Sequence, residues 1–226
     1  MNNLFPENEL KKLMEFYHTR DEWEKILEYR KLTTQIKPVE NIFFGDSITW
    51  AWPLQEFFPT VSLLSRGIPG DNIIGLNYRL DDDVLAYSPR RVFMLVGING
   101  IEADKNLILA RIKAVTTKMT DMGIEVYLSS ILPLRYPDSW NRFQYQNKIV
   151  EINHELADWS HDHATGFLDY HSILKDDCGQ LAAEYAMPDG THITFAAYRR
   201  MSELIFPILR LSDAFCFNIS NQIEQK

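Results

Sequence analysis

Three residues of this sequence have side chains that could work together in nucleophilic catalysis. Ser47 follows the apolar segment NIFF (41–44) within Gly45-Asp46-Ser47, and Asp189 and His192 lie three residues apart in YAMPDGTHITF (185–195). A serine hydroxyl is a weak nucleophile until a base removes its proton, and a histidine oriented by a carboxylate is such a base. The spacing lets one turn carry both groups, with Asp189 holding the His192 ring through Nδ1–H and Nε2 accepting the Ser47 proton.

Each of these motifs also has an ordinary structural interpretation. Gly-Asp-Ser can simply end a strand in a turn, Asp-Gly is a frequent turn sequence, and His192 could be an exposed side chain. Thr194 is a suitable N-cap for a helix that begins near Phe195. Taken singly, neither motif distinguishes catalysis from these alternatives.

Donors for a negatively charged reaction intermediate occur after two further apolar segments. Gly67 lies in SRGIPGDN (65–72), just after VSLL (61–64), and Asn99 lies in VGING (96–100), at the end of RVFMLV (91–96). The backbone N–H groups of Ser47 and Gly67 and the side-chain amide of Asn99 could supply three donors to an oxyanion.

The elements that must position these residues alternate along the chain. Strand-length apolar segments occur at 41–44, 61–64, 91–96, 124–129 and 166–169, and helix-like stretches occur at 104–121, 139–163 and 195–211. This alternation predicts an α/β fold with a parallel sheet covered on both faces. Five strands in such a sheet favour the order 2-1-3-4-5, with ligands bound beyond the carboxyl ends of the strands.

The segments outside this pattern carry weaker signals. Residues 6–31 have apolar residues at helical spacing, which predicts one or two amphipathic helices. These could cover the sheet, form a lid or join a homodimer, and packing onto the same domain is favoured. The acidic run Asp81–Asp83 is expected to end a helix on a solvated surface.

Composition limits the class of protein. The chain has 226 residues, of which 46% are hydrophobic and 24% charged, and its net charge is −8 with a pI near 5.3. These values predict a folded protein that repels nucleic acid and anionic lipid, and no apolar run approaches the length of a membrane span. Cys178 and Cys216 have no metal-like or redox-like spacing and the N-terminus has no signal-peptide pattern, so we expect a cytoplasmic protein. No cofactor is needed, and HDH (161–163) lacks the further ligands of a metal site.

In chain order, GDS (45–47), Gly67, GIN (97–99) and DGTH (189–192) resemble the four sequence blocks of the SGNH hydrolases, also called the GDSL esterase/lipase family. The resemblance implies a flavodoxin-like three-layer α/β/α fold with Ser47 as nucleophile, Asp189 and His192 as its partners, and Gly67 and Asn99 as oxyanion donors beside the Ser47 N–H. One departure occurs in the third block, where Gly100 replaces the usual acid. This departure puts the bonding within that loop in question.

The sequence is most similar to the branch with platelet-activating-factor acetylhydrolase-like proteins and carbohydrate O-acetylesterases. This similarity implies a serine esterase for short acyl esters, above all acetyl esters, of a small-molecule substrate. Lysophospholipase or thioesterase activity, or a non-catalytic flavodoxin-like binding module, are the alternatives. We expect a single domain over 1–226, with an N-terminal helical extension (1–38), a catalytic core (39–211) and a C-terminal tail (212–226).

Residues around the predicted nucleophile are candidates for substrate binding. Asp46, Trp50, Trp52 and Arg66 form this set. The two tryptophans could wall an acyl or sugar pocket, although their spacing also fits a hydrophobic core, and Arg66 could meet an anionic group or pair with a surface acid. Tyr136, Trp140 and Phe143, in the loop-like stretch after the fourth strand, could shape the mouth of the site.

Overall fold

The computed structural model describes residues 4–33, 35, 39–138 and 140–209. Its centre is a five-stranded parallel sheet in the order β2-β1-β3-β4-β5. The strands are β1 (Asn41–Gly45), β2 (Leu63–Gly67), β3 (Arg91–Leu95), β4 (Glu125–Ser129) and β5 (Gly166–Leu168). The predicted fold class and strand order are therefore confirmed.

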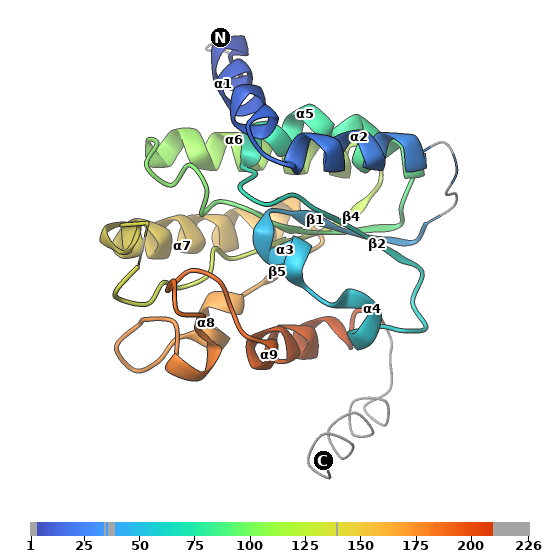
Figure 1. Cartoon of the computed structure of the whole chain (residues 1–226). Helices are drawn as coiled ribbons and strands as arrows, with labels where there is room; N and C mark the ends of the chain where they lie inside the picture. The colour runs from blue at the N-terminus through green and yellow to red at the C-terminus, as the bar shows by residue number, and fades with distance from the viewer. Residues whose placement is uncertain (1–3, 34, 36–38, 139, 210–226) are drawn as a thin grey trace.

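Helices cover both faces of the sheet (Figure 1). One face packs against α5 (Ile73–Asp83), α6 (Lys105–Thr120) and α7 (Gln146–His163), whose apolar side chains join those of Ile42, Phe44, Val92 and Met94. The other packs against α3 (Ser47–Ala51), α4 (Leu54–Phe57), α8 (Tyr170–Leu174) and α9 (Phe195–Ile205), around Phe43 and Phe93. Alternate strand residues thus serve two separate cores, as expected for a sheet buried on both sides.

The N-terminal segment forms two helices, α1 (Glu7–His18) and α2 (Glu22–Thr33), which lie over α5 (Figure 1). Tyr17, Ile26 and Tyr29 are buried there together with Ile68 and Ile74. Among the alternatives for this segment, the structure shows packing onto the rest of the same chain. The predicted tail at 212–226 lies outside the described residues.

Among the residues that the structure describes, the connections contain short 3₁₀ helices at Leu85–Tyr87, Phe143–Tyr145 and Ala183–Tyr185. The helix α7 begins at Gln146 rather than near residue 139. Before it, Asp138 accepts hydrogen bonds from the N–H groups of Trp140 and Arg142 and so holds a turn, which the 3₁₀ helix Phe143–Tyr145 follows. Helix α9 ends at Ile205, two residues before Pro207. Proline lacks the backbone N–H that would continue the hydrogen bonds of the helix. Residues 210 and 211 of that predicted helix lie outside the described residues.

The acidic run at the end of α5 differs from expectation. Asp81 is exposed, but Asp83 is buried, with 1% of its surface exposed, and accepts a hydrogen bond from Arg79 at 2.6 Å. Because Arg79 and Asp83 are four residues apart, they lie on the same side of α5, the side that faces the sheet. The expectation of a wholly solvated acidic surface is therefore wrong for Asp83.

Candidate active site

Ser47 is the first residue of α3 and follows β1 after a single intervening residue. That residue, Asp46, is the N-cap of α3 and accepts a hydrogen bond from the Ile48 N–H at 3.0 Å. Capping by an aspartate satisfies one backbone donor of the first helical turn. The turn therefore presents the half-buried Ser47 at the carboxyl edge of the sheet.

The turn before α9 brings His192 to this edge. His192 Nε2 lies 2.9 Å from Ser47 Oγ, and His192 Nδ1 lies 2.6 Å from Asp189 Oδ2. Burial alone would raise the pKa of Asp189, but hydrogen bonds from the His192 ring and from the Thr191 and His192 N–H groups bring it below its ordinary value. An ionised carboxylate only accepts, so Nδ1 carries the proton of the neutral ring and Nε2 accepts from the Ser47 hydroxyl.

Contacts with the loop after β4 fix the turn that carries Asp189 and His192. The Arg135 N–H donates to the Gly190 carbonyl at 2.9 Å, and the Thr191 hydroxyl donates to Asp138 at 3.2 Å. Thr194 caps α9 through the Ala197 N–H, as its sequence position predicts. The capping and catalytic interpretations of this segment are thus compatible.

Gly67 lies beside the backbone of α3. It pairs in register with Gly45, and a Cβ at position 67 would lie 2.1 Å from Trp50 N. Only glycine lets the end of β2 approach the helix that begins with Ser47 so closely. The structure thus brings the backbone of Gly67 against α3, at Thr49 and Trp50.

The side-chain amide of Asn99 is held at both ends. Its Nδ2 donates to the Asp71 carbonyl at 2.8 Å, and its Oδ1 accepts from Arg142 Nη2 at 3.0 Å. A carboxamide has two N–H donors, so a second remains for another acceptor. The neighbouring Gly100 has φ +85°, a conformation that glycine adopts without strain.

Of the four proposed substrate-binding residues, Trp50 is exposed, and Asp46, Trp52 and Arg66 are buried. Trp50 is 52% exposed, whereas Asp46 is almost wholly buried, and burial raises its pKa to about 7. Trp52 is buried among Phe43, Tyr170 and Tyr198. Trp52 is therefore a core residue, and its assignment to a pocket wall is wrong.

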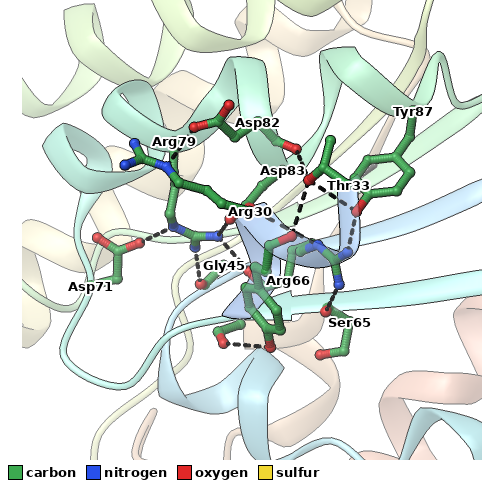
Figure 2. Close-up of polar contacts among 12 residues, drawn as sticks. Arg30, Thr33, Gly45, Ser65, Arg66, Asp71, Arg79, Asp82, Asp83 and Tyr87 are labelled. Carbon is green, nitrogen blue, oxygen red and sulfur yellow. Dashed lines mark hydrogen bonds and ion pairs between the residues drawn. The ribbon is translucent and has the colours of Figure 1, made fainter. Parts of the chain in front are cut away.

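Arg66 also differs from its expected role. Its guanidinium is buried, lies over the rings of Tyr29 and Tyr87, and donates to the Tyr87 hydroxyl at 2.7 Å (Figure 2). Successive strand residues point to opposite faces of a sheet, so adjacency to Gly67 did not imply that the Arg66 side chain faces the same site. The expectation that Arg66 contacts an anionic substrate group is therefore wrong.

Trp140 and Arg142, in the loop after β4, lie close to His192 and Asn99. The ring of Trp140, which is 50% exposed, stands edge-on to His192 with centroids 5.3 Å apart, in agreement with a place at the mouth. Arg142, which contacts Asn99, was missed by sequence reasoning. A lone arginine in a loop carries no signal of its own, and only its spacing of four residues from Asp138 hinted at a shared turn.

A narrow hollow of about 10 Å³ adjoins these residues. Its walls include Asp46 and Ile48 on either side of Ser47, and Thr191 next to His192; the remaining lining is apolar, from Leu95, Val96, Ile98, Ile131, Leu132 and Leu134. A larger depression of about 570 Å³ lies elsewhere, near Arg135, Lys175 and Arg200, and includes none of Ser47, Asp189 and His192. The lining of the hollow does not include these three residues either, but it includes their chain neighbours Asp46, Ile48 and Thr191, so the hollow lies next to the site.

A doubly wound α/β sheet with a serine, histidine and aspartate hydrogen-bonded at its carboxyl edge defines a class of acyl hydrolases. Residues 43–200 match the family model of the GDSL-like lipase/acylhydrolase family, and the chain belongs to this family. Membership supports hydrolysis of carboxylic esters. The family resemblance predicted from the sequence is thus confirmed.

Solved structures agree with this assignment. The chain is 27% identical to a Streptococcus pneumonia protein named provisionally as a platelet activating factor, with a TM-score of 0.76 over 90% of this chain and all of the other. It is 25% identical to a Bacteroides fragilis protein named provisionally as an acylhydrolase, with a TM-score of 0.75 over 83% and 97% of the two chains. An acetyl xylan esterase, AlAXEase, shares the fold at 24% identity and a TM-score of 0.61, over 76% and 99%. No curated protein matches the chain significantly.

Within the described part of the chain, the helices are too short or too polar to cross a membrane.

Proposed function

We propose that this protein is a serine esterase that removes short acyl groups, acetyl above all, through an acyl-enzyme on Ser47. The observation that carries the proposal is the continuous hydrogen-bonded series from Ser47 through His192 to Asp189. In the first step Ser47 Oγ attacks the ester carbonyl while His192 Nε2 takes its proton. The same nitrogen then gives that proton to the departing alcohol, and water repeats the sequence to release the acid.

The charge on the tetrahedral intermediate would be met by three donors. These are the N–H groups of Ser47 and Gly67 and the second N–H of the Asn99 amide. Asn99 supports this role because Arg142 and the Asp71 carbonyl fix its orientation before any substrate binds. Donors that are already oriented stabilise developing charge without reorganisation.

The dimensions of the site support a short acyl group. The hollow beside Ser47 has room for about one water-sized group, and its walls are mostly aliphatic. Next to His192, the exposed ring of Trp140 offers a face on which a sugar could stack, and Trp50, on the same helix as Ser47, is a second exposed ring. An O-acetylated carbohydrate therefore fits both sides of the site.

The test is hydrolysis of p-nitrophenyl esters from acetate to palmitate, and of acetylated sugars, by the wild-type protein and by Ser47→Ala. We expect the wild-type rate to fall steeply beyond the shortest chains. Ser47→Ala should lower kcat by a factor of about 10⁴ to 10⁶ with an unchanged circular dichroism spectrum, since the nucleophile is lost.

Three results would contradict the proposal in different ways. Hydrolysis of p-nitrophenyl acetate by Ser47→Ala at the wild-type rate would exclude the nucleophile. Preference for palmitate over acetate would exclude the short-chain assignment and favour a lysophospholipase or thioesterase. Failure of a fluorophosphonate to label the wild-type serine would favour a binding module.

A further inference from the structure

The strand ends that carry the site meet at one buried guanidinium, that of Arg79 on α5 (Figure 2). Arg79 is 1% exposed. Its Nη2 donates to the Gly45 carbonyl at 2.8 Å and its Nη1 donates to the Arg66 carbonyl at 2.9 Å. Gly45 precedes Ser47 by two residues and Arg66 precedes Gly67 by one, so a single side chain holds the backbone on which both lie.

Arg79 also reaches the third proposed donor. Its Nε donates to Asp71 Oδ2 at 2.7 Å, and the backbone carbonyl of Asp71 accepts the hydrogen bond from Asn99 Nδ2. The planar guanidinium presents several donors in fixed directions, which suits simultaneous contact with two carbonyls and a carboxylate. Ser47, Gly67 and Asn99 are thus linked through Arg79 without any of them touching it.

The two N-terminal helices complete this arrangement. Tyr17 of α1 donates a hydrogen bond to Asp71 Oδ1, and Tyr29 of α2 donates to the Gly67 carbonyl at 3.3 Å. Burial raises the pKa of the Tyr17 hydroxyl, which therefore stays protonated and remains a donor. Each helix thus contributes one hydroxyl to the segment between β2 and α5.

Stability alone is a poor explanation for this cluster. Arg66, Arg79, Asp71 and Asp83 are each at most 2% exposed and sum to no net charge. Removing four charges from water has a high free-energy cost, and apolar side chains of similar volume often give equal or greater stability. Apolar side chains could not donate hydrogen bonds to the carbonyls of Gly45 and Arg66, as Arg79 does.

We propose that Arg79 is a positioning residue for the oxyanion donors, and that α1 and α2 maintain its geometry through Tyr17 and Tyr29. This inference rests on the proposed esterase function. It assigns to the N-terminal helices a part in catalysis.

The experiment compares Tyr17→Phe and Tyr29→Phe with Tyr87→Phe. Tyr87 is a matched control because it is buried in the same cluster, accepts from Arg66 Nη2 and donates to Thr33 Oγ1 at 3.2 Å, so its hydroxyl bonds no backbone carbonyl of the site. Each substitution removes one buried hydroxyl, and thermal unfolding verifies that the variants are folded at the assay temperature.

For Tyr17→Phe and Tyr29→Phe we expect kcat on p-nitrophenyl acetate to fall by about 3- to 10-fold, with KM within about twofold of wild type, because misplaced donors affect the transition state most. The rate of fluorophosphonate labelling of Ser47 should fall in parallel, since that reaction also places negative charge on the donors. Tyr87→Phe should change kcat by less than about twofold while its melting temperature falls. Arg79→Lys, which retains the charge but not the planar fork, should lower kcat further.

The inference is overturned if Tyr17→Phe and Tyr29→Phe both lose thermal stability and keep the wild-type kcat, or if Tyr87→Phe loses as much kcat as they do. These results are distinct from failure of the esterase proposal itself. If Ser47→Ala is inactive while the tyrosine variants are fully active, only the positioning role is lost. If Ser47→Ala is active, the proposed esterase function itself is wrong, whatever the tyrosine variants show.

Discussion

Among the residues of the site, Asp46 has the least usual environment. It lies between Gly45 and Ser47, is buried, and forms part of the wall of the hollow. Burial raises its pKa to about 7, with a further contribution from the charge of Asp71. A carboxyl that prefers its neutral form beside the proposed nucleophile makes the stability of this region sensitive to pH.

The sign of this effect follows from proton binding. In the unfolded chain an aspartate titrates near its ordinary value of 3.8, so between about pH 4 and 7 the folded state binds more protons at Asp46 than the unfolded state. The contribution of Asp46 to the free energy of unfolding should therefore decrease as the pH rises through that range. Asp46→Asn cannot ionise and keeps an oxygen that can accept from the Ile48 N–H, so it should remove the decline.

We expect Asp46→Asn to gain stability relative to wild type between pH 5 and pH 8, by no more than about 4 kcal/mol, since one pKa unit corresponds to about 1.4 kcal/mol. Urea unfolding at several pH values measures this. Asp104→Asn is the matched control, because Asp104 caps α6 in the same way but is exposed to water. If the free energy of unfolding depended on pH equally in the two variants, Asp46 would not be the source of the effect.

For individual residues, the sequence predicted the roles that depend on residue type. It did not predict those that depend on the side of a strand or helix from which the side chain projects. Ser47, Asp189 and His192 were recognisable because few other combinations could activate a serine, and the structure brings all three together. The substrate assignment of Arg66 failed because sequence proximity does not give the side of a strand on which a side chain lies. Arg79 was not recognised, since an arginine on a helix resembles any surface charge until its burial is known.

At the scale of elements, the close approach of β2 to α3 determines the site. A Cβ at position 67 would overlap the backbone at Trp50 and Thr49, and backbone cannot move aside as a flexible side chain can. Thr49 and Trp50 follow Ser47 within the same short helix, so a displacement of α3 alters the distance from Ser47 to His192. Gly67 thus contacts the helix that carries the proposed nucleophile.

Gly67→Ala should therefore lower kcat/KM by about 10- to 100-fold, because displacements near 1 Å in a catalytic constellation have effects of this size. Steady-state kinetics on p-nitrophenyl acetate measures the effect. Gly166→Ala is a suitable control, since the added Cβ at that strand position would meet only the ring of Tyr127, at 3.1 Å. Wild-type kinetics for Gly67→Ala would show that the helix tolerates the shift.

Element boundaries were less predictable than element types. The second strand was expected at 61–64 but runs over Leu63–Gly67, including the polar pair Ser65 and Arg66. Periodicity excluded those residues because the sequence does not reveal that Tyr29 and Tyr87 cover the arginine. Strands β1 and β3, which lack such polar residues in their interiors, were predicted to within one residue.

For the molecule as a whole, the N-terminal helices and the sheet share buried polar contacts as well as apolar ones. Tyr17 bonds Asp71, Tyr29 bonds Gly67, and Arg111 of α6 donates to the Leu4 carbonyl and pairs with Glu9 at 2.9 Å. Losing α1 and α2 would leave several of these groups buried or exposed without their partners, at considerable free-energy cost. We expect the helices and the sheet to unfold together.

Hydrogen–deuterium exchange and thermal denaturation can test this expectation. Peptides from α1 and α2 should open with nearly the same free energy as peptides from β1 and β3, and tryptophan fluorescence and circular dichroism should report one coincident transition. If the N-terminal peptides unfolded in a separate, earlier transition, α1 and α2 would not form one cooperative unit with the sheet.

Ser47 and His192 are 145 positions apart in the chain, yet their side chains form one hydrogen bond. During synthesis Ser47 therefore emerges long before His192 does, and a nascent chain that ends before position 192 lacks the base that the proposed mechanism needs. Under that mechanism, ester hydrolysis begins only after the segment that carries His192 has folded against the end of β1.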